Sequence, residues 1–201
     1  MNERAPGTAP EPSPLWGEGR VRGASKPTCA AGAPPSDRRY ARQTVLPEIG
    51  EGGQAKLAAS KVLVIGAGGL GSPALLYLAA AGVGTLGIVD HDQVELSNLQ
   101  RQILFETSDI GRKKSDAASD ALADLNPDIR IEPHATRLTA DNAHALFAPY
   151  DLILDGSDNL TTRYAVNDAC AYLGKPLISA AVQGFEGQLY VFPFQNPEDP
   201  C

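Results

Sequence analysis

Hydrophobic residues along most of this chain form short runs that alternate with longer stretches of mixed polarity. Short apolar runs predict buried strands, here at residues 61–66, 85–90, 129–135, 152–154 and 177–180. Apolar positions at helical spacing predict helices, here at residues 70–81, 113–125, 140–147 and 160–173. A hairpin-like pair of strands is expected around residues 183–192. This regular alternation predicts an α/β fold with a mostly parallel, doubly wound sheet and antiparallel strands at its C-terminal end.

Residues 1–38 do not follow this pattern. They are rich in Pro, Gly, Ala and Ser and lack periodic hydrophobic positions. Such a segment cannot bury enough apolar surface to offset the entropy of ordering, so we expect a disordered leader. The sequence therefore divides into this leader and one folded domain at residues 39–201.

Composition narrows the class of protein. With 43% hydrophobic residues among 201, the chain can bury a sizeable core. It contains no run near the roughly 20 apolar residues of a membrane span, and its N-terminus lacks the apolar region of a signal peptide, so we expect a cytoplasmic protein without membrane contact. The net charge of −7 combines +2 in residues 1–39 with −9 in residues 40–201, and this acidic folded part argues against nucleic-acid binding.

The cysteines Cys29, Cys170 and Cys201 form no C-x-x-C pair. This usage favours a reducing compartment and excludes a self-contained four-cysteine zinc site. The histidines His91, His134 and His144 show no metal-binding spacing, and the sequence assigns them no role.

A glycine-rich turn, GAGGLG, follows the first predicted strand. This G-x-G-x-x-G pattern binds nucleotide phosphates when it joins a strand to a helix. Gly66 permits the tight turn, Gly68 lets the backbone approach a phosphate, and Gly71 lets the helix pack on the strand. The free N–H groups at the helix start attract the anion. Asp90 ends the next strand, nineteen residues past Gly71, where an acid accepts hydrogen bonds from ribose hydroxyls. These features predict a Rossmann-like nucleotide site.

The polar segment SNLQRQ at residues 97–102 favours a triphosphate over a nicotinamide dinucleotide. It places Ser97, Asn98 and Arg101 beside the phosphate turn. A nicotinamide enzyme neutralises its pyrophosphate with the helix N-terminus, whereas an additional fixed cation suits a triphosphate with a leaving group to stabilise. An NAD-dependent oxidoreductase stays as the alternative, although neither a substrate domain nor an acid/base residue for it is visible.

Asp158 and Asn159 follow the predicted strand at residues 152–154, at the edge where ligands bind in such sheets. The Asp158 carboxylate could hold Mg²⁺, which prefers one or two protein carboxylates together with phosphate oxygens. The competing interpretation is that Asp158 or Asn159 caps the helix that follows. We favour the metal role for Asp158.

Other cations lie outside these motifs. Lys113 and Lys114 fall in a first helical turn, where they oppose the helix dipole, so one of them is a candidate phosphate ligand and the alternative is a solvated basic patch. Arg42 lies in a segment without a core pattern. That segment is either a linker or an arm that reaches a nucleotide, including that of a partner subunit.

In their order along the chain, these motifs resemble the MoeB/ThiF-type (HesA/MoeB/ThiF) adenylyltransferases, relatives of the ubiquitin-activating enzymes. The resemblance covers about residues 40–201 and is carried by RYARQ, GAGGLG, VDHDQVELSNLQRQ, GRKK, DGSDN with TTRY, and EGQLYVF. The SNLQRQ version looks like that of enzymes acting on sulfur-carrier proteins. Related tRNA-modifying dehydratases carry a different sequence there.

The resemblance implies that the C-terminal glycine carboxylate of a ubiquitin-like sulfur-carrier protein, from a molybdopterin or thiamine pathway, attacks the α-phosphate of ATP. The products are an acyl-adenylate and pyrophosphate. Catalytic roles are implied for Arg101, for Asp158 with Mg²⁺, and for Arg42, which would reach the neighbouring subunit's ATP in a homodimer. The implied ATP-binding residues are Gly66, Gly68, Gly69, Gly71, Asp90, Ser97, Asn98, Arg101, Lys114, Asp158 and Asn159.

Members of this family continue with two C-x-x-C pairs that complete a zinc site. Cys201, the last residue here, matches the first cysteine of the first pair. The resemblance thus implies a domain incomplete at its C-terminus, with Cys201 as one ligand of an incomplete zinc site and an exposed sheet edge. A third hypothesis is therefore a fragment that binds nucleotide without turnover.

Overall fold

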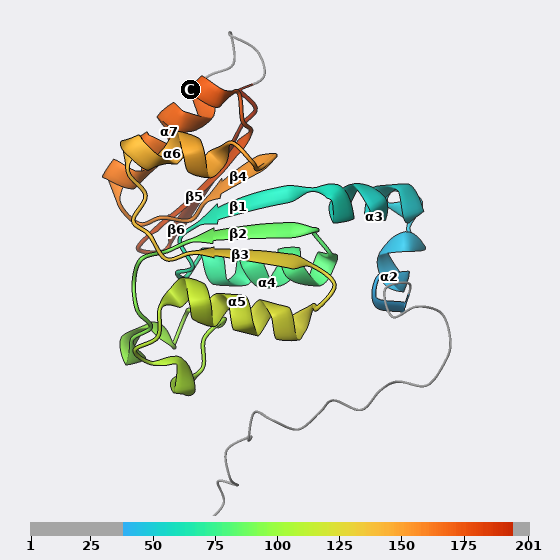
Figure 1. The fold of residues 1–201 in the computed structure, drawn as a ribbon, viewed down its shortest axis with the longest axis horizontal. Helices are drawn as coiled ribbons and strands as arrows, with labels where there is room; N and C mark the ends of the chain where they lie inside the picture. Colours follow the sequence, from blue (N-terminus) through green and yellow to red (C-terminus); the bar gives the residue numbers. More distant parts are fainter. Residues whose placement is uncertain (1–37, 195–201) are drawn as a thin grey trace, which may run out of the picture. The chain divides into compact units, whose positions relative to one another are not determined.

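The computed structural model describes residues 38–194, which form a six-stranded sheet with helices on both faces (Figure 1). Two helices come first, α2 (Ala41–Thr44) and α3 (Gly50–Ala59). The alternating elements are then β1 (Lys61–Ile65), α4 (Gly71–Ala81), β2 (Thr85–Val89), α5 (Lys114–Leu125), β3 (Arg130–His134), α6 (Ala140–Phe147), β4 (Leu152–Asp155), α7 (Leu160–Leu173), β5 (Leu177–Gln183) and β6 (Glu186–Phe192). Two 3-10 helices, η1 (Leu96–Asn98) and η2 (Thr107–Asp109), lie between β2 and α5. The predicted leader, apart from Arg38, and Cys201 lie outside the described residues.

The strand order is β3-β2-β1-β4-β5-β6. The five strands β1 to β5 pair with their neighbours in parallel, and β6 pairs antiparallel to β5. The chain builds outward from β1 to β3 and then crosses to the other side of β1 with β4. The order therefore reverses between β1 and β4, and ligands bind at such a switch point, outside the carboxyl ends of the strands. The predicted fold class is confirmed.

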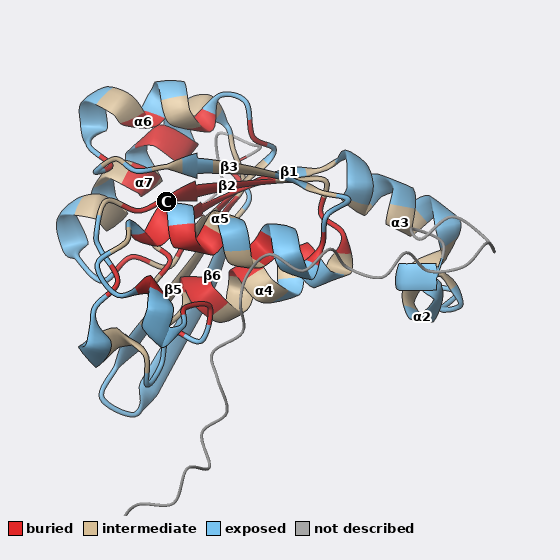
Figure 2. Ribbon diagram, turned by 60° about the horizontal axis from the view of Figure 1, so that its bottom comes forward, coloured by how far each residue is buried: buried red, intermediate tan, exposed pale blue. Residues whose placement is uncertain are grey.

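Each face of the sheet has its own core (Figure 2). Because side chains alternate along a strand, Val62 and Val64 of β1 pack in a cluster with residues of α4 and α5. Leu63 and Ile65 pack instead with residues of α6 and α7. This double burial explains why β1 is apolar almost without interruption, and it fixes the carboxyl end of β1 where the glycine turn begins.

Element boundaries agree closely with the sequence pattern. Helices α6 and α7 have the predicted bounds, and α4 and α5 each begin one residue later than predicted. The main difference is β5, which extends beyond residue 180 to Gln183. Its extra residues pair with β6, for example Ala181 with Gln188. This pairing depends on the partner strand, so the apolar pattern of β5 alone could not reveal it.

Helices α2 and α3 were not predicted. Neither contains a buried residue, so neither shows the apolar stripe that predicts a helix. Polar contacts hold α2 instead: Gln43 Nε2 donates to Ala81 O at 3.1 Å, and Asn126 Nδ2 donates to the Tyr40 hydroxyl at 2.7 Å. These contacts place α2 at the C-terminal end of α4, on the amino edge of the sheet. None of the helices in residues 38–194 is long and apolar enough to cross a membrane.

Candidate functional site

A cavity of about 820 Å³ lies at the carboxyl edge of the sheet, where β1, β2 and β4 end. Small-molecule sites typically enclose roughly 300–1,000 Å³. The cavity is lined by the glycine turn and by residues that follow β2, β3 and β4. It therefore occupies the switch point that the sheet topology defines.

The glycine turn presents unpaired donors to this cavity. The backbone N–H groups of Gly68, Gly69 and Leu70 have no acceptor within residues 38–194, and all three residues line the cavity. A β-carbon at Gly71 would lie 1.8 Å from Gly66 O, so only glycine allows α4 to approach the turn this closely. Consecutive free N–H groups at a helix start form an anion-binding concavity. The turn is built to receive phosphate.

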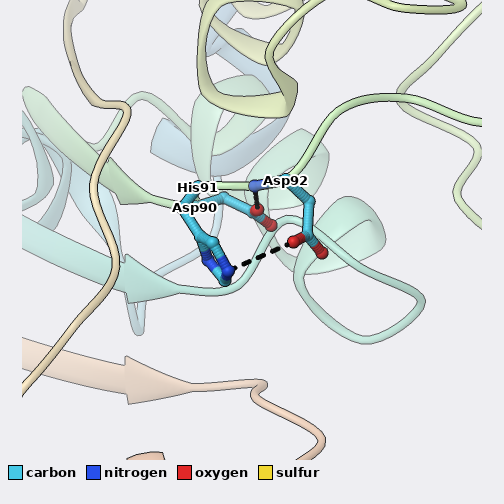
Figure 3. Close-up of side chains that lie close together, drawn as sticks. All are labelled: Asp90, His91 and Asp92. Atoms are coloured by element: carbon cyan, nitrogen blue, oxygen red, sulfur yellow. Dashed lines mark hydrogen bonds and ion pairs between the residues drawn. The ribbon is translucent and has the colours of Figure 1, made fainter.

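Asp90, directly after β2, stabilises this turn through hydrogen bonds. Its carboxylate is buried and accepts hydrogen bonds from Ala67 N at 2.8 Å and Asp92 N at 2.9 Å. Asp90 also lines the cavity, in the position where an acid would meet ribose. Figure 3 shows Asp90 beside His91 and Asp92. One nitrogen or oxygen atom from each of these side chains lies within 4.8 Å of the others. The Lys114 amine already contacts Asp92, and the Arg137 guanidinium contacts His91, so this cluster does not suit a metal ion.

Of the two neighbours Lys113 and Lys114, it is Lys114 that faces the cavity. Its side chain is 8% exposed, it lines the cavity, and its Nζ lies 3.1 Å from Asp92 Oδ2. Burial alone would raise the Asp92 pKa, but the hydrogen bond and charge of Lys114, with the charges of His91 and Arg137, hold that pKa below its usual value. Lys113 is exposed and donates to His91 O at 2.9 Å. The structure thus distinguishes two neighbours that the sequence could not.

The SNLQRQ segment divides into two parts. Arg101 and Gln102 line the cavity, with the Arg101 side chain beside Gly69. The Arg101 guanidinium is exposed and makes one hydrogen bond within residues 38–194, to Ser97 O at 3.2 Å. Ser97 and Asn98 do not line the cavity; Asn98 Oδ1 accepts from Glu95 N at 3.2 Å in a local cap. Arg101 is therefore the residue of this segment that is free to meet an anion.

The loop after β4 contains a free carboxylate. Asp158 lines the cavity, is exposed, and has no hydrogen bond or ion pair among the residues that the structure describes. Asn159 caps α7, since its side chain accepts from Thr162 N at 2.9 Å. The capping role that competed for Asp158 thus belongs to Asn159. An uncommitted carboxylate opposite the phosphate turn fits Mg²⁺, which binds one or two protein carboxylates and phosphate oxygens.

Other residues of the cavity had no predicted role. Gln102 is buried, lies beside Gly68, and has an Oε1 without a partner among the described residues. Arg163 of α7 donates to Ser157 O and to Ala180 O, which ties the loop after β4 to β5. The TTRY motif contains Arg163, but spacing alone could not show that it faces the cavity.

Arg42 and Cys170 lie away from the cavity. Arg42 is on α2, at the amino edge of the sheet, and α4 alone, with 11 residues, spans about 16 Å from that edge to the turn. Cys170 is fully buried in the core, where burial, followed by the charge of Asp155, raises its thiol pKa to about 12. It is a structural thiol of the core.

The fold and the cavity define a Rossmann-type α/β protein with an anion-binding turn at its switch point. Residues 40–201 match the ThiF family, to which the chain belongs. Over 154 residues, 77% of this chain, it is 54% identical to the "Probable adenylyltransferase/sulfurtransferase MoeZ" of Mycobacterium tuberculosis and 52% identical to the "Sulfur carrier protein adenylyltransferase" of Thermus thermophilus. The chain spans 39% and 57% of the lengths of these two relatives. The resemblance seen in the motifs is confirmed.

Solved structures of the same fold include nucleotide complexes. E. coli tRNA N6-threonylcarbamoyladenosine dehydratase, TcdA, in complex with ATP matches 75% of this chain and 61% of its own, with a TM-score of 0.71 and 26% identity. PaaA matches 88% of this chain and 57% of its own, with a TM-score of 0.73 and 25% identity. E. coli MccB with ATP matches 64% of this chain and 38% of its own, with a TM-score of 0.58 and 30% identity.

Proposed function

We propose that the chain is an ATP-dependent adenylyltransferase that activates the C-terminal glycine carboxylate of a ubiquitin-like sulfur-carrier protein. One observation carries this proposal. Three unpaired backbone N–H groups, the buried Lys114 amine, the Arg101 guanidinium and the free Asp158 carboxylate all line one cavity at the switch point. A triphosphate with Mg²⁺ needs this combination of donors, cations and one hard ligand.

Each group has a chemical task in this proposal. The N–H groups of Gly68 and Gly69 and the start of α4 bind phosphate oxygens. Lys114 and Arg101 neutralise the negative charge that shifts toward pyrophosphate as it leaves. Asp158 would hold Mg²⁺, which supplies further charge neutralisation when bound. Asp90 orients the ribose while its hydrogen bond to Ala67 N keeps the turn in place.

The reaction requires no general base on the protein. The carrier's carboxylate is already ionised at neutral pH, so it can attack the α-phosphorus directly. One P–O bond forms, the bond to the β-phosphate oxygen breaks, and pyrophosphate leaves with its electron pair. Catalysis then depends on positioning and charge neutralisation, which the residues of the cavity can supply.

A homodimer would explain the place of Arg42. This arginine lies on α2, at the opposite edge of the sheet from the cavity, too far to reach its own nucleotide. Helices α2 and α3 with the loop between them form an N-terminal arm, and this loop exposes the apolar residues Val45 and Leu46. We propose that the arm packs on a second copy and presents Arg42 to that copy's ATP, where a cation supplied in trans can accelerate phosphoryl transfer by about 10³-fold or more.

An exposed apolar surface suits the docking of a protein substrate. Strand β6 is an edge strand, and Phe185, Leu189 and Val191 on and before it are largely exposed. Exposed apolar patches of this kind mark protein interaction sites. Gln183 and Gln188, on either side of the turn between β5 and β6, line the cavity, so a carrier bound at this edge could extend its tail into the cavity.

ATP–pyrophosphate exchange with the carrier protein present tests the proposal. The unmodified chain should catalyse exchange, and Arg101→Ala should abolish it, whereas Arg130→Ala, at the amino end of β3, should leave it unchanged. Retention of most exchange by Arg101→Ala would refute the site assignment. ATP binding without any exchange by the unmodified chain would favour the alternative, a chain that binds nucleotide without turnover.

A further inference from the structure

The direction of the nucleotide in the cavity follows from the sheet. Phosphates belong at the glycine turn after β1, and ribose belongs at Asp90 after β2. The base is attached on the far side of the ribose from the phosphates, so it must lie toward β3, the next strand in the sheet. The segment that follows β3 lines the same cavity with Thr136, Arg137 and Leu138. This segment therefore forms the wall of the base subsite.

The floor of this subsite is apolar and rigid. Ile65, Val89 and Leu138 all line the cavity and belong to one buried core cluster. The backbone between them is fixed as well, since Asn142 Nδ2 at the start of α6 donates to Arg137 O at 2.9 Å. Leu138 is thus held in the core, while the neighbouring Arg137 side chain is exposed at the rim. A planar base would have an apolar surface beneath it and a cation beside it.

The Arg137 guanidinium contacts the imidazole of His91. Its Nη2 lies 2.8 Å from His91 Nε2. Arginine can only donate, so Arg137 Nη2 is the donor in this contact. The same His91 Nε2 lies 3.4 Å from Asp92 Oδ1, which fixes the imidazole between Asp92 and Arg137. Nε and Nη1 of Arg137 have no hydrogen-bond partner in residues 38–194. The cation is oriented by this contact, and most of its donors and its planar face stay available.

We infer that Arg137 lays its guanidinium plane against the base of the bound nucleotide, and that His91 is the residue that positions it. A guanidinium stacks on aromatic rings and donates to ring nitrogens, which an ammonium cannot do with the same geometry. This inference rests on the proposed function only in taking ATP as the nucleotide. It assigns base recognition to a segment outside the motifs that bind phosphate and ribose.

The test compares a ligand that has a base with one that lacks it. Calorimetric titrations of the full chain would measure the dissociation constants of Mg·ATP and of inorganic tripolyphosphate. For Arg137→Met we expect Mg·ATP to bind about 3- to 30-fold more weakly, the range of a cation–π contact, and tripolyphosphate to bind unchanged. The matched control is Arg130→Met, which removes an exposed arginine from the opposite end of β3 and should change neither constant.

Two further variants separate stacking and positioning from simple charge. Arg137→Lys keeps the charge but not the plane and should recover only part of the Mg·ATP affinity. His91→Leu should weaken Mg·ATP binding selectively, and His91→Gln, whose amide oxygen can accept from Arg137, should restore it. Retained tripolyphosphate binding shows in each case that the variant is folded.

The outcomes also distinguish this inference from the proposed function. If the unmodified chain does not bind Mg·ATP, the proposed function fails. If it binds Mg·ATP but Arg137→Met binds it equally well, or loses tripolyphosphate affinity to the same extent, the base-contact inference fails alone. Full recovery of affinity by Arg137→Lys would likewise overturn it.

Discussion

Lys113 and Lys114 are adjacent in the sequence but differ in environment, which makes them a matched pair for testing the phosphate site. Lys114 is 6% exposed and faces the cavity, whereas Lys113 is exposed and its amine donates to the main-chain oxygen of His91. Each can be replaced by methionine, which keeps the length of the stem and removes the charge. The two variants have the same change in net charge, so any difference between them reports the position of the amine.

The size of the expected loss in activity follows from the hydrogen bond that Lys114 would make to a phosphate oxygen. A hydrogen bond to a charged group contributes about 1.5–3 kcal/mol, or roughly 10- to 160-fold in an equilibrium or rate constant. The Asp92 side chain left behind is 54% exposed, so water can replace the amine. The loss of folding stability should therefore stay below about 1 kcal/mol.

We expect Lys114→Met to lower kcat/KM for ATP in the exchange assay by about 10- to 160-fold, and Lys113→Met to change it less than about twofold. Urea unfolding of both variants checks that the fold is intact. Equal losses in the two variants, or full activity of Lys114→Met, would refute the assignment of Lys114 to the phosphates.

Two further predictions concern the folding of the chain. Gly71→Ala should lower the free energy of unfolding in urea by about 3 kcal/mol, because the new methyl group would meet Gly66 O. Gly52→Ala is the control: nothing lies within 4 Å of its new carbon, so its free energy of unfolding should stay within about 1 kcal/mol of the parent value. Burial raises the pKa of Cys170 from 9.0 to about 12. Between these pH values the unfolded chain ionises this thiol while the folded chain does not. The free energy of unfolding should therefore fall by up to about 1.4 kcal/mol per pH unit as the pH rises. Cys170→Ala should remove this part of the alkaline loss, and an unchanged slope would contradict the assigned cause.

The fold could be predicted from the sequence because burial on both faces leaves a strong signal. Strand β1 is apolar through to Ile65 and ends directly at the glycine turn, and α6 and α7 have apolar positions at helical spacing. Helices α2 and α3 could not be predicted because polar contacts, such as that of Gln43 with Ala81 O, hold α2 in place. Such contacts join residues far apart in the sequence and leave no periodic pattern.

The candidate site was predictable where backbone geometry determines it. Gly66 and Gly71 occupy positions that a side chain would block or strain, and Asp90 must follow β2. Side-chain direction was not predictable: the sequence could not show which of Lys113 and Lys114 faces inward. The contact between His91 and Arg137, 46 residues apart, depends on how two strand ends meet in the folded sheet.

The central claim, that the cavity at the switch point is an ATP site, is tested most directly by titrating the full chain with Mg·ATP and, separately, with NAD. We expect Mg·ATP to bind with one site per chain and to require Mg²⁺ for full affinity, and we expect no binding of NAD. Binding of NAD, or no binding of Mg·ATP, would contradict the assignment of the glycine turn, Lys114 and Asp158 to a triphosphate.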